Sequence, residues 1–371
     1  MRAHSLFLTF TLMFVLKAQP PSLHWAQATG GAGQETWKDV AVDGAGSVVT
    51  VGNLLTSGTP IDLDPGPGLF NVVSTSSSYD VYFRKMTANG DFLWGGVFGG
   101  TTTDNGFSIA TDAAGNVFLA GNIVGSNVDL DPGAGVFPVT TSNGGYDAFL
   151  VKLSSSGGFL WGRIFGGLGT DAAHAIAVDG AGAVWVTGVL GNGGDLDPGT
   201  GSFTVTGNGL QDIFIVKLDE NGGFVWGGSV GGTANDIGRG IAITPNGHAV
   251  VCGEFRGTAD FDPGAGTLSR TSGGDADMFV IRLDGSGALQ WAHRFGGTSF
   301  ETARGIAVDG SGDIVFTGEV NSTTDMDIGS GTANLAGTFN EPSFVARLDG
   351  AAAHQWSFLL PGFINKGNGV A

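Results

Sequence analysis

The stretch that decides the fold runs from residue 161 to 226. It reads Trp161-Gly-Arg-Ile-Phe-Gly-Gly167, a polar loop, Ala175-Ile-Ala-Val-Asp179, a turn, Val184-Trp-Val-Thr-Gly188, a long connection, Asp212-Ile-Phe-Ile-Val-Lys-Leu218, and a second turn before Trp226. The same order recurs, and its opening tryptophans are Trp25, Trp94, Trp161, Trp226, Trp291 and Trp356, at steps of 69, 67, 65, 65 and 65 residues. This period suits one supersecondary unit of about four strands, stacked on copies of itself.

The composition indicates an all-β chain. Glycine accounts for 68 of 371 residues, and only 13% of residues are charged. Glycine at this density destabilises helices and marks turns between short strands. One such turn is Asp179-Gly-Ala-Gly182, with counterparts that begin at Asp43, Asp112 and Asp309, and the fourth repeat writes it as Thr244-Pro-Asn-Gly247. With 42% hydrophobic residues, the chain can also build a core.

The order of the strands follows from their apolar patterns. Residues 212–218 are apolar at successive positions apart from one lysine, which predicts a strand buried on both faces of its sheet. We expect each unit to be a four-stranded meander, innermost near Ile176, then Val186, then Ile215, with the Trp-led strand outermost. Solenoid coils repeat at about 20 to 30 residues, and a two-sheet sandwich would not explain the repeat. The sequence therefore predicts a β-propeller.

The repeat also resembles a known family. Gly166-Gly167, Ile176–Asp179, Thr187-Gly188, Asp212–Leu218 and Trp226 make up a pattern similar to that of the bacterial secreted β-propeller repeat family (SBBP type). The match covers residues 25–371. The resemblance implies a propeller in an extracellular or cell-surface setting, and it brings neither an activity nor a catalytic residue.

The number of blades stays open at this point. Five complete repeats start at Trp25, Trp94, Trp161, Trp226 and Trp291, and a partial one starts at Trp356. The segment Asn368-Gly-Val-Ala371 resembles the start of a further inner strand. The alternatives are a five-bladed ring with overlapping ends, a six-fold ring with a thin last blade, and an unclosed arc that leaves exposed sheet faces.

Residues 1–22 read as a signal peptide ahead of a propeller domain at 23–371. Arg2 precedes an apolar run from Leu6 to Leu16, which is too short to span a membrane comfortably. The cleavage site is uncertain because Leu16-Lys17-Ala18 is an imperfect small-x-small match. The alternative is a buried N-terminal strand. We expect a secreted or cell-surface protein.

Charge and cysteine content narrow the partners. The net charge of −18 argues against nucleic-acid binding and against adhesion to anionic membranes. We expect a monomer with no membrane insertion. Cys252 is the single cysteine, so no intrachain disulfide is possible, and its slot holds small residues in the other repeats. We interpret it as a small core residue rather than a nucleophile.

An Asp-x-Asp motif in the long connection is the candidate metal site. Alternating carboxylates at a strand end are hard oxygen ligands that suit Ca²⁺, and this is the one cofactor the sequence suggests. The residues are Asp62, Asp64, Asp129, Asp131, Asp195, Asp197, Asp260, Asp262, Asp325 and Asp327. We expect them to share a rim with Asp104, Asp171, Asp236 and Glu301. The alternative is structural, because Asp-Pro-Gly marks a turn without any ion and the EF-hand pattern is absent.

One basic residue recurs on the third strand of each unit. The set is Lys85, Lys152, Lys217, Arg282 and Arg347. A cation on a strand buried on both sides requires an acidic partner or must reach the rim. We expect one ion pair per blade, and the alternative is an anion-binding ring.

Signals of catalysis are weak. The six histidines show no metal spacing, no serine lies in a Gly-x-Ser-x-Gly elbow, and the Gly-x-Gly strings lie in turns rather than before helices. We therefore expect a non-catalytic binding, adhesion or scaffold module for protein or glycan. The alternative is an extracellular propeller enzyme, a polysaccharide lyase or hydrolase, that uses the Asp-rich face.

Overall fold

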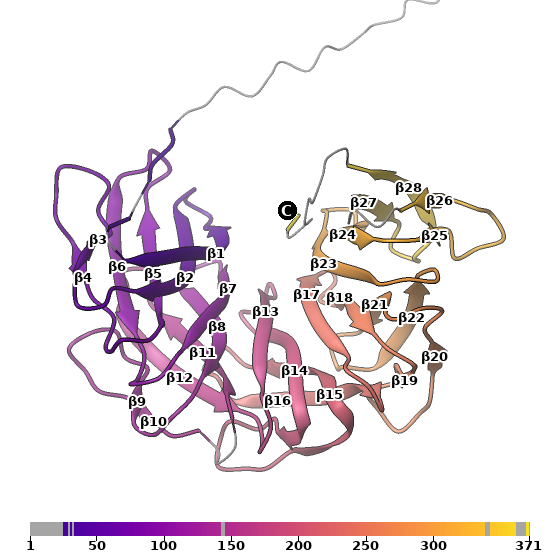
Figure 1. Ribbon diagram of the computed structural model, residues 1–371, viewed down its shortest axis with the longest axis horizontal. Helices are drawn as coiled ribbons and strands as arrows, with labels where there is room; N and C mark the ends of the chain where they lie inside the picture. The colour runs from indigo at the N-terminus through magenta and orange to yellow at the C-terminus, as the bar shows by residue number, and fades with distance from the viewer. Residues whose placement is uncertain are drawn as a thin grey trace, which may run out of the picture.

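The computed structural model describes residues 25–28, 30–31, 33–141, 145–337, 342–360 and 369–370. The proposed signal peptide at 1–22 lies outside the described residues. The described part of the chain consists of strands and their connections (Figure 1). This confirms the all-β class.

The main strands form five four-stranded antiparallel blades, and the third of these sheets continues into the short hairpin of β19 (Thr258–Asp260) and β20 (Ser269–Thr271). The first contains β1 (Gln34–Val42), β2 (Val48–Leu55), β5 (Asp80–Met86) and β6 (Phe92–Phe98). The second contains β7 (Asn105–Thr111), β8 (Val117–Ile123), β11 (Asp147–Leu153) and β12 (Phe159–Phe165). The third contains β13 (Ala172–Val178), β14 (Val184–Asp195), β15 (Thr204–Leu218) and β16 (Phe224–Gly232). The fourth contains β17 (Ile237–Ile243), β18 (Ala249–Phe255), β21 (Asp277–Leu283) and β22 (Leu289–Phe295). The fifth contains β23 (Glu301–Val308), β24 (Ile314–Val320), β27 (Ser343–Leu348) and β28 (His354–Leu359).

The predicted strand order is confirmed. Each sheet is a meander in which the first strand pairs with the second, the second with the third, and the third with the Trp-led fourth. The inner strands β1, β7, β13, β17 and β23 contact one another in sequence. The sequence repeat and the sheet are therefore offset by one strand, because each Trp-led strand completes the blade before it.

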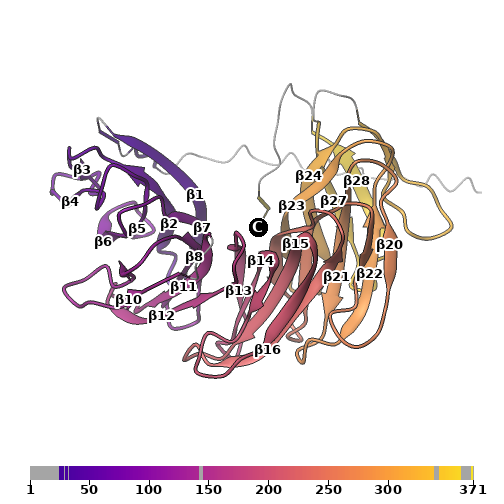
Figure 2. The ribbon, with the colours of Figure 1, turned by 60° about the horizontal axis from the view of Figure 1, so that its bottom comes forward.

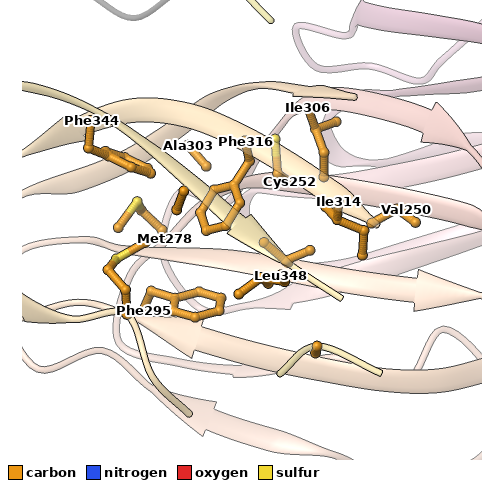
Figure 3. Packing of buried hydrophobic residues seen from close by; sticks show 14 of the residues in the cluster. Val250, Cys252, Met278, Phe295, Ala303, Ile306, Ile314, Phe316, Phe344 and Leu348 are labelled. Carbon is orange, nitrogen blue, oxygen red and sulfur yellow. The ribbon is translucent and has the colours of Figure 1, made fainter. Parts of the chain in front are cut away.

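Apolar side chains fill the space between consecutive blades. Figure 3 shows this core between the fourth and fifth blades, where Val250 and Met278 face Ile306 and Phe316. Cys252 lies in the same cluster and is fully buried. This burial among apolar side chains confirms the interpretation of Cys252 as a small core residue, and it raises the pKa of the thiol to about 12.

The recurring tryptophan joins one blade to the next. Trp94 Nε1 donates a hydrogen bond to Ser155 O at 3.1 Å, and Trp161 Nε1 donates to Glu220 O at 3.2 Å. Both acceptors lie in the turn between the third and fourth strands of the following blade. Gly157 and Gly222 have φ of 88° and 75° in these turns, and an added Cβ would come within 2.9 Å and 3.1 Å of the indole rings. Glycine is thus required there for both its backbone conformation and its lack of a side chain.

The described blades form an unclosed arc. Figures 1 and 2 show the first and last blades on either side of an opening, and no contact comparable to those between consecutive inner strands joins β1 to β23 among the described residues. Val40 on β1 is 58% exposed, whereas Ile109 at the same position of β7 is 4% exposed. Of the three alternatives for closure, this is the third.

Short segments occupy part of both open faces. Trp25 Nε1 donates to Ala88 O at 2.8 Å and lies over Gly90, which is how Trp94 docks on the second blade. At the other end, a Cβ on Gly305 of β23 would lie 2.8 Å from Gly369 Cα. Gly369 and Val370 thus lie where the next inner strand would begin, as their resemblance to that strand predicts.

Candidate functional site

The Asp-x-Asp motifs lie in small hairpins, one on each blade. The hairpins are β3 (Ile61–Asp62) with β4 (Asn71–Val72), β9 (Val128–Asp129) with β10 (Pro138–Val139), the end of β14 with the start of β15, β19 (Thr258–Asp260) with β20 (Ser269–Thr271), and β25 (Thr323–Asp325) with β26 (Asn334–Ala336). In the second blade, Asp129 Oδ1 accepts N–H bonds from Asp131 and Phe137, and Asp131 Oδ1 accepts one from Gly133. The same three bonds recur in all five hairpins.

These hairpins pack as wedges between blades. The residue between the two aspartates is buried in every copy: Leu63, Leu130, Leu196, Phe261 and Met326. In the second blade, Leu130 lies against Gly162 of β12, and Pro132 lies against Gly96 of the preceding blade. The acids therefore have a structural task whether or not an ion binds, since each shapes a turn that inserts an apolar side chain into the core.

The predicted shared rim is confirmed. Gly99 and Gly166, which end Trp-led strands, form β-bridges with Asp129 and Asp195 of the following hairpins. Asp104 Oδ2 accepts an N–H bond from Gly100 at 2.6 Å, and Asp171 Oδ2 accepts one from Gly167. The acids that follow the Gly-Gly pairs, such as Asp104 and Asp171, thus lie at the same edge of the blades as the Asp-x-Asp pairs.

Burial raises the pKa of three aspartates that follow a Gly-Gly pair. The pKa of Asp104 rises to about 7 and those of Asp171 and Asp236 to about 6, although two backbone N–H bonds to each carboxyl act in the opposite direction. Asp80, Asp147 and Asp212 add a smaller repulsion to Asp104, Asp171 and Asp236 respectively. A carboxyl whose folded pKa is raised contributes stability below its unfolded pKa, and this stability is lost as pH rises through the folded value.

We therefore expect the protein to be more stable at pH 5 than at pH 8. The melting temperature should fall by at least about 5 °C between these values, because the stability lost as the buried carboxyls ionise exceeds the opposite contribution of His174, whose pKa is lowered by burial. The measurement is differential scanning calorimetry across this range. Asp104→Asn should reduce the drop, and an equal or higher melting temperature at pH 8 would contradict the raised pKa values.

The ion pairs expected on the third strand are confirmed in four blades. Lys85 Nζ lies 2.8 Å from Asp43 Oδ2, and Arg347 Nη2 lies 2.7 Å from Asp309 Oδ2. Lys152 and Lys217 pair with the turn acids of their own blades, Asp112 and Asp179, at 3.5 Å. The lysines also reach across the interface, since Lys152 Nζ donates to Glu220 O of the next blade at 3.0 Å. They are therefore structural groups of the blade interfaces.

The fourth blade departs from this expectation. Its turn carries Thr244 where the others carry aspartate, and Arg282 has no acidic partner among the described residues. Instead, Arg282 Nε contacts His248 Nδ1 at 3.2 Å, and Nη1 donates to Gly350 O of the next blade at 2.5 Å. The forked side chain of Arg282 thus reaches neutral acceptors in place of a turn acid, whereas Arg347 of the fifth blade keeps its acid.

A different set of residues faces the axis of the arc. Each inner strand carries a β-bulge at one shared position, seen as a register shift against the second strand. The bulged residues are Lys38, Phe107, His174, Arg239 and Arg304. With Trp37 they line an axial cavity of about 480 Å³. A bulge turns its side chain out of the regular pleat, which explains why these five side chains converge here.

Buried glutamates hold the two axial arginines. Arg239 Nε and Nη2 donate to Glu254 at 2.5 and 2.6 Å, and Arg304 Nε donates to Glu319 at 2.7 Å. Both glutamates are almost fully buried on the second strands of their blades, and Thr302 also donates to Glu254. The anchored guanidinium groups are therefore fixed in place beside the cavity.

His174 contributes a neutral ring to the cavity. Burial lowers its pKa to about 4, and its hydrogen bond to Gly238 O acts in the opposite direction. Because a carbonyl only accepts, Nδ1 at 3.0 Å carries the proton, and Nε2 is left as an acceptor. The ring packs edge-on against Phe107 with centroids 5.6 Å apart.

The sequence interpretation missed this axial set. The Asp motifs attracted attention because they recur almost unchanged, whereas the axial position holds lysine, phenylalanine, histidine or arginine. Aligning the inner strands on their Ile-Ala-Val ends would have placed all five in one slot, two residues before Val40, Ile109, Ile176, Ile241 and Ile306. That slot holds a cation in three repeats and a ring in two.

Comparison with known proteins gives two distant similarities. The chain is 23% identical, over 94% of its length, to an uncharacterised WD repeat-containing protein of Acanthamoeba polyphaga mimivirus, of which it covers 30%. It is 26% identical, over 62% of its length, to the regulatory protein FlaEY of Caulobacter vibrioides, of which it covers 23%. The chain thus spans less than a third of either relative, and no family model matches it.

The fold and these similarities define the class of protein. The chain is a β-propeller repeat protein of five described blades. Among the described residues, no helix is long and apolar enough to cross a bilayer.

Proposed function

We propose that this chain is a non-catalytic binding or scaffold module, secreted or displayed at the cell surface, that recognises a protein or a glycan at its axial cavity. The observation that carries the proposal is the inner-strand bulge. Five blades share its backbone, yet four kinds of side chain occupy the position: Lys38, Phe107, His174, and arginine at both 239 and 304. Because the five bulges share one backbone conformation but carry different kinds of side chain, together they form one composite site in an otherwise repetitive molecule.

The Asp-x-Asp hairpins give no comparable site. In each hairpin, one carboxylate oxygen of each aspartate accepts hydrogen bonds from backbone N–H groups of the same turn, as Asp195 and Asp197 illustrate. Burial alone would raise the pKa of Asp195, but the bonds from Phe203, Asp197 and Ser202 hold it below its ordinary value. A carboxyl kept ionised by its own turn is poorly suited to act as a general acid.

The extracellular setting rests on the N-terminal sequence. A basic start followed by an apolar run from Leu6 to Leu16 is typical of export signals. The resemblance to the secreted repeat family points the same way. Mass spectrometry of the mature protein would test this, and an intact N-terminus on a protein retained inside the cell would contradict it.

The experiment that tests the proposed function is a glycan and protein array probed with the full chain, with a parallel assay for cleavage of any bound polysaccharide. Binding without turnover supports a binding module. Turnover would replace it with the lyase or hydrolase alternative, and the absence of any bound protein or glycan would remove the proposal.

Calcium binding stays a prediction. Among the described residues, no group of three or more His, Cys, Asp or Glu side chains gathers as metal ligands, so Ca²⁺ at a hairpin would also need backbone carbonyls and water. If the hairpins bind Ca²⁺, millimolar CaCl₂ should raise the melting temperature by about 5 °C or more over protein treated with a chelator. Calorimetric curves that superimpose in both conditions would remove Ca²⁺ from the account.

A further inference from the structure

Several hydrogen-bond donors at the axial cavity are not paired with the acidic residues around them. Lys38 is exposed at the bulge of β1, and nothing in the described part of the chain pairs with it. Glu254 engages Nε and Nη2 of Arg239, and Glu319 engages Nε of Arg304. Nη1 of Arg239 and both terminal nitrogens of Arg304 are left without a hydrogen-bond partner among the described residues.

The acidic residues near the axis form hydrogen bonds elsewhere and do not pair with these free donors. Glu254 and Glu319 lie on second strands and do not line the cavity. Asp39 lines a neighbouring pocket that shares Lys38, Phe107 and His174 with the cavity, but Asp39 Oδ2 accepts bonds from Ser108 Oγ and Ile109 N, both at 2.9 Å. The groups that face the cavity freely are therefore cationic donors, in a protein whose net charge is −18.

Flat apolar surfaces complete the lining. Trp37 and Phe107 both face the cavity beside the neutral ring of His174. Trp37 is braced by Tyr82, with ring centroids 4.1 Å apart, and Phe107 is braced by His174. Braced rings lose little conformational entropy when they stack on the C–H face of a sugar.

We propose that the axial cavity binds a carboxylate-bearing sugar residue of an acidic glycan, with Lys38, Arg239 and Arg304 on the carboxylate and Phe107 and Trp37 against the ring. This inference rests on the proposed binding function and names its ligand class. A volume of about 480 Å³ suits one or two sugar residues. Fixed guanidinium groups favour a planar carboxylate, because they can donate two parallel N–H bonds to it.

The test is isothermal titration of the full chain with tetragalacturonate, with its fully methyl-esterified form, and with neutral galactotetraose. We expect the acidic tetrasaccharide to bind at least about tenfold more tightly than either uncharged form, and its affinity to fall as salt is raised. Lys38→Met should weaken it by about tenfold without changing the melting temperature, because Lys38 has no partner to lose. Arg256→Gln, which removes a cation away from the axis, should bind like the wild type.

The outcomes separate this inference from the proposed function. Equal binding of the neutral sugar, or equal binding of hexaglutamate, would overturn the acidic-glycan assignment while leaving a binding module in place. Wild-type affinity in Lys38→Met would also overturn it. If none of these probes binds and the arrays hold no ligand, both proposals fail together.

Discussion

Trp161→Ala is expected to lower the free energy of unfolding by about 3–5 kcal/mol, whereas Trp356→Ala should change it by less than about 1 kcal/mol. Both residues lie at the third position of an outermost strand, but their surroundings differ. Trp161 is 9% exposed and donates to Glu220 O in the third blade, while Trp356 is 38% exposed. Among the described residues, no following blade covers Trp356. The pair is therefore a matched test of packing between blades.

Urea unfolding followed by circular dichroism would measure this difference as a shift in midpoint. Repeat proteins can unfold in stages, so both variants must be compared under identical conditions. Equal losses for Trp161→Ala and Trp356→Ala would mean that the tryptophan stabilises its own blade rather than the interface. In that case the turn at Gly222 would have no role in joining blades.

Lys85→Met is the second large expected effect, a loss of about 3 kcal/mol. The Lys85 and Asp43 side chains are only 4% and 5% exposed. Lys85 Nζ also donates to Gly115 O and Ser155 O of the second blade, at 3.2 and 3.4 Å. Methionine keeps most of the volume but leaves the Asp43 carboxylate buried without its cation. Chemical denaturation at pH 7 would measure the loss.

The pH dependence of this variant follows from Asp43. Burial alone would raise the pKa of Asp43, but Lys85 and two backbone N–H bonds hold it below its ordinary value. Such a group contributes stability above its unfolded pKa, which is lost as pH falls through the folded pKa. The advantage of the wild type over Lys85→Met should therefore shrink below about pH 4.

Two further variants control for other causes. Adding Asp43→Asn to Lys85→Met should recover part of the loss, because no unpaired charge is then buried. Lys217→Met should cost less than Lys85→Met, since its pair with Asp179 is longer, at 3.5 Å, and more exposed. Neutral outcomes for both lysine variants would refute the structural role of these pairs.

The repeat made much of the architecture predictable. The strand order, the tryptophan between blades, the burial of Cys252 and the shared rim follow from local patterns that recur in each copy. The acids of the first turn and the cations of the third strand were both visible. Their pairing was predictable because a strand buried on both faces cannot leave a lysine uncompensated.

The axial site and the opening were not predictable in the same way. The bulges at Lys38 and Arg304 cannot be recognised from the residue types around them. Glu254 lies 15 residues from Arg239, on a neighbouring strand. The opening depends on the angle between packed blades, which side-chain packing over whole interfaces sets. The candidate site is formed by residues that vary between the repeats, whereas an interpretation based on the repeat draws attention to the residues that the repeats share.

The most direct test of the central claim, that binding lies at the axis and the Asp-bearing rim is architectural, is one glycan and protein array probed with three forms of the chain. The forms are the wild type, the axial double variant Lys38→Met/Phe107→Ala, and the rim variant Asp197→Asn. We expect the wild type and the rim variant to bind the same ligands and the axial variant to lose them. Loss of binding in Asp197→Asn, with full binding in the axial variant, would contradict the account.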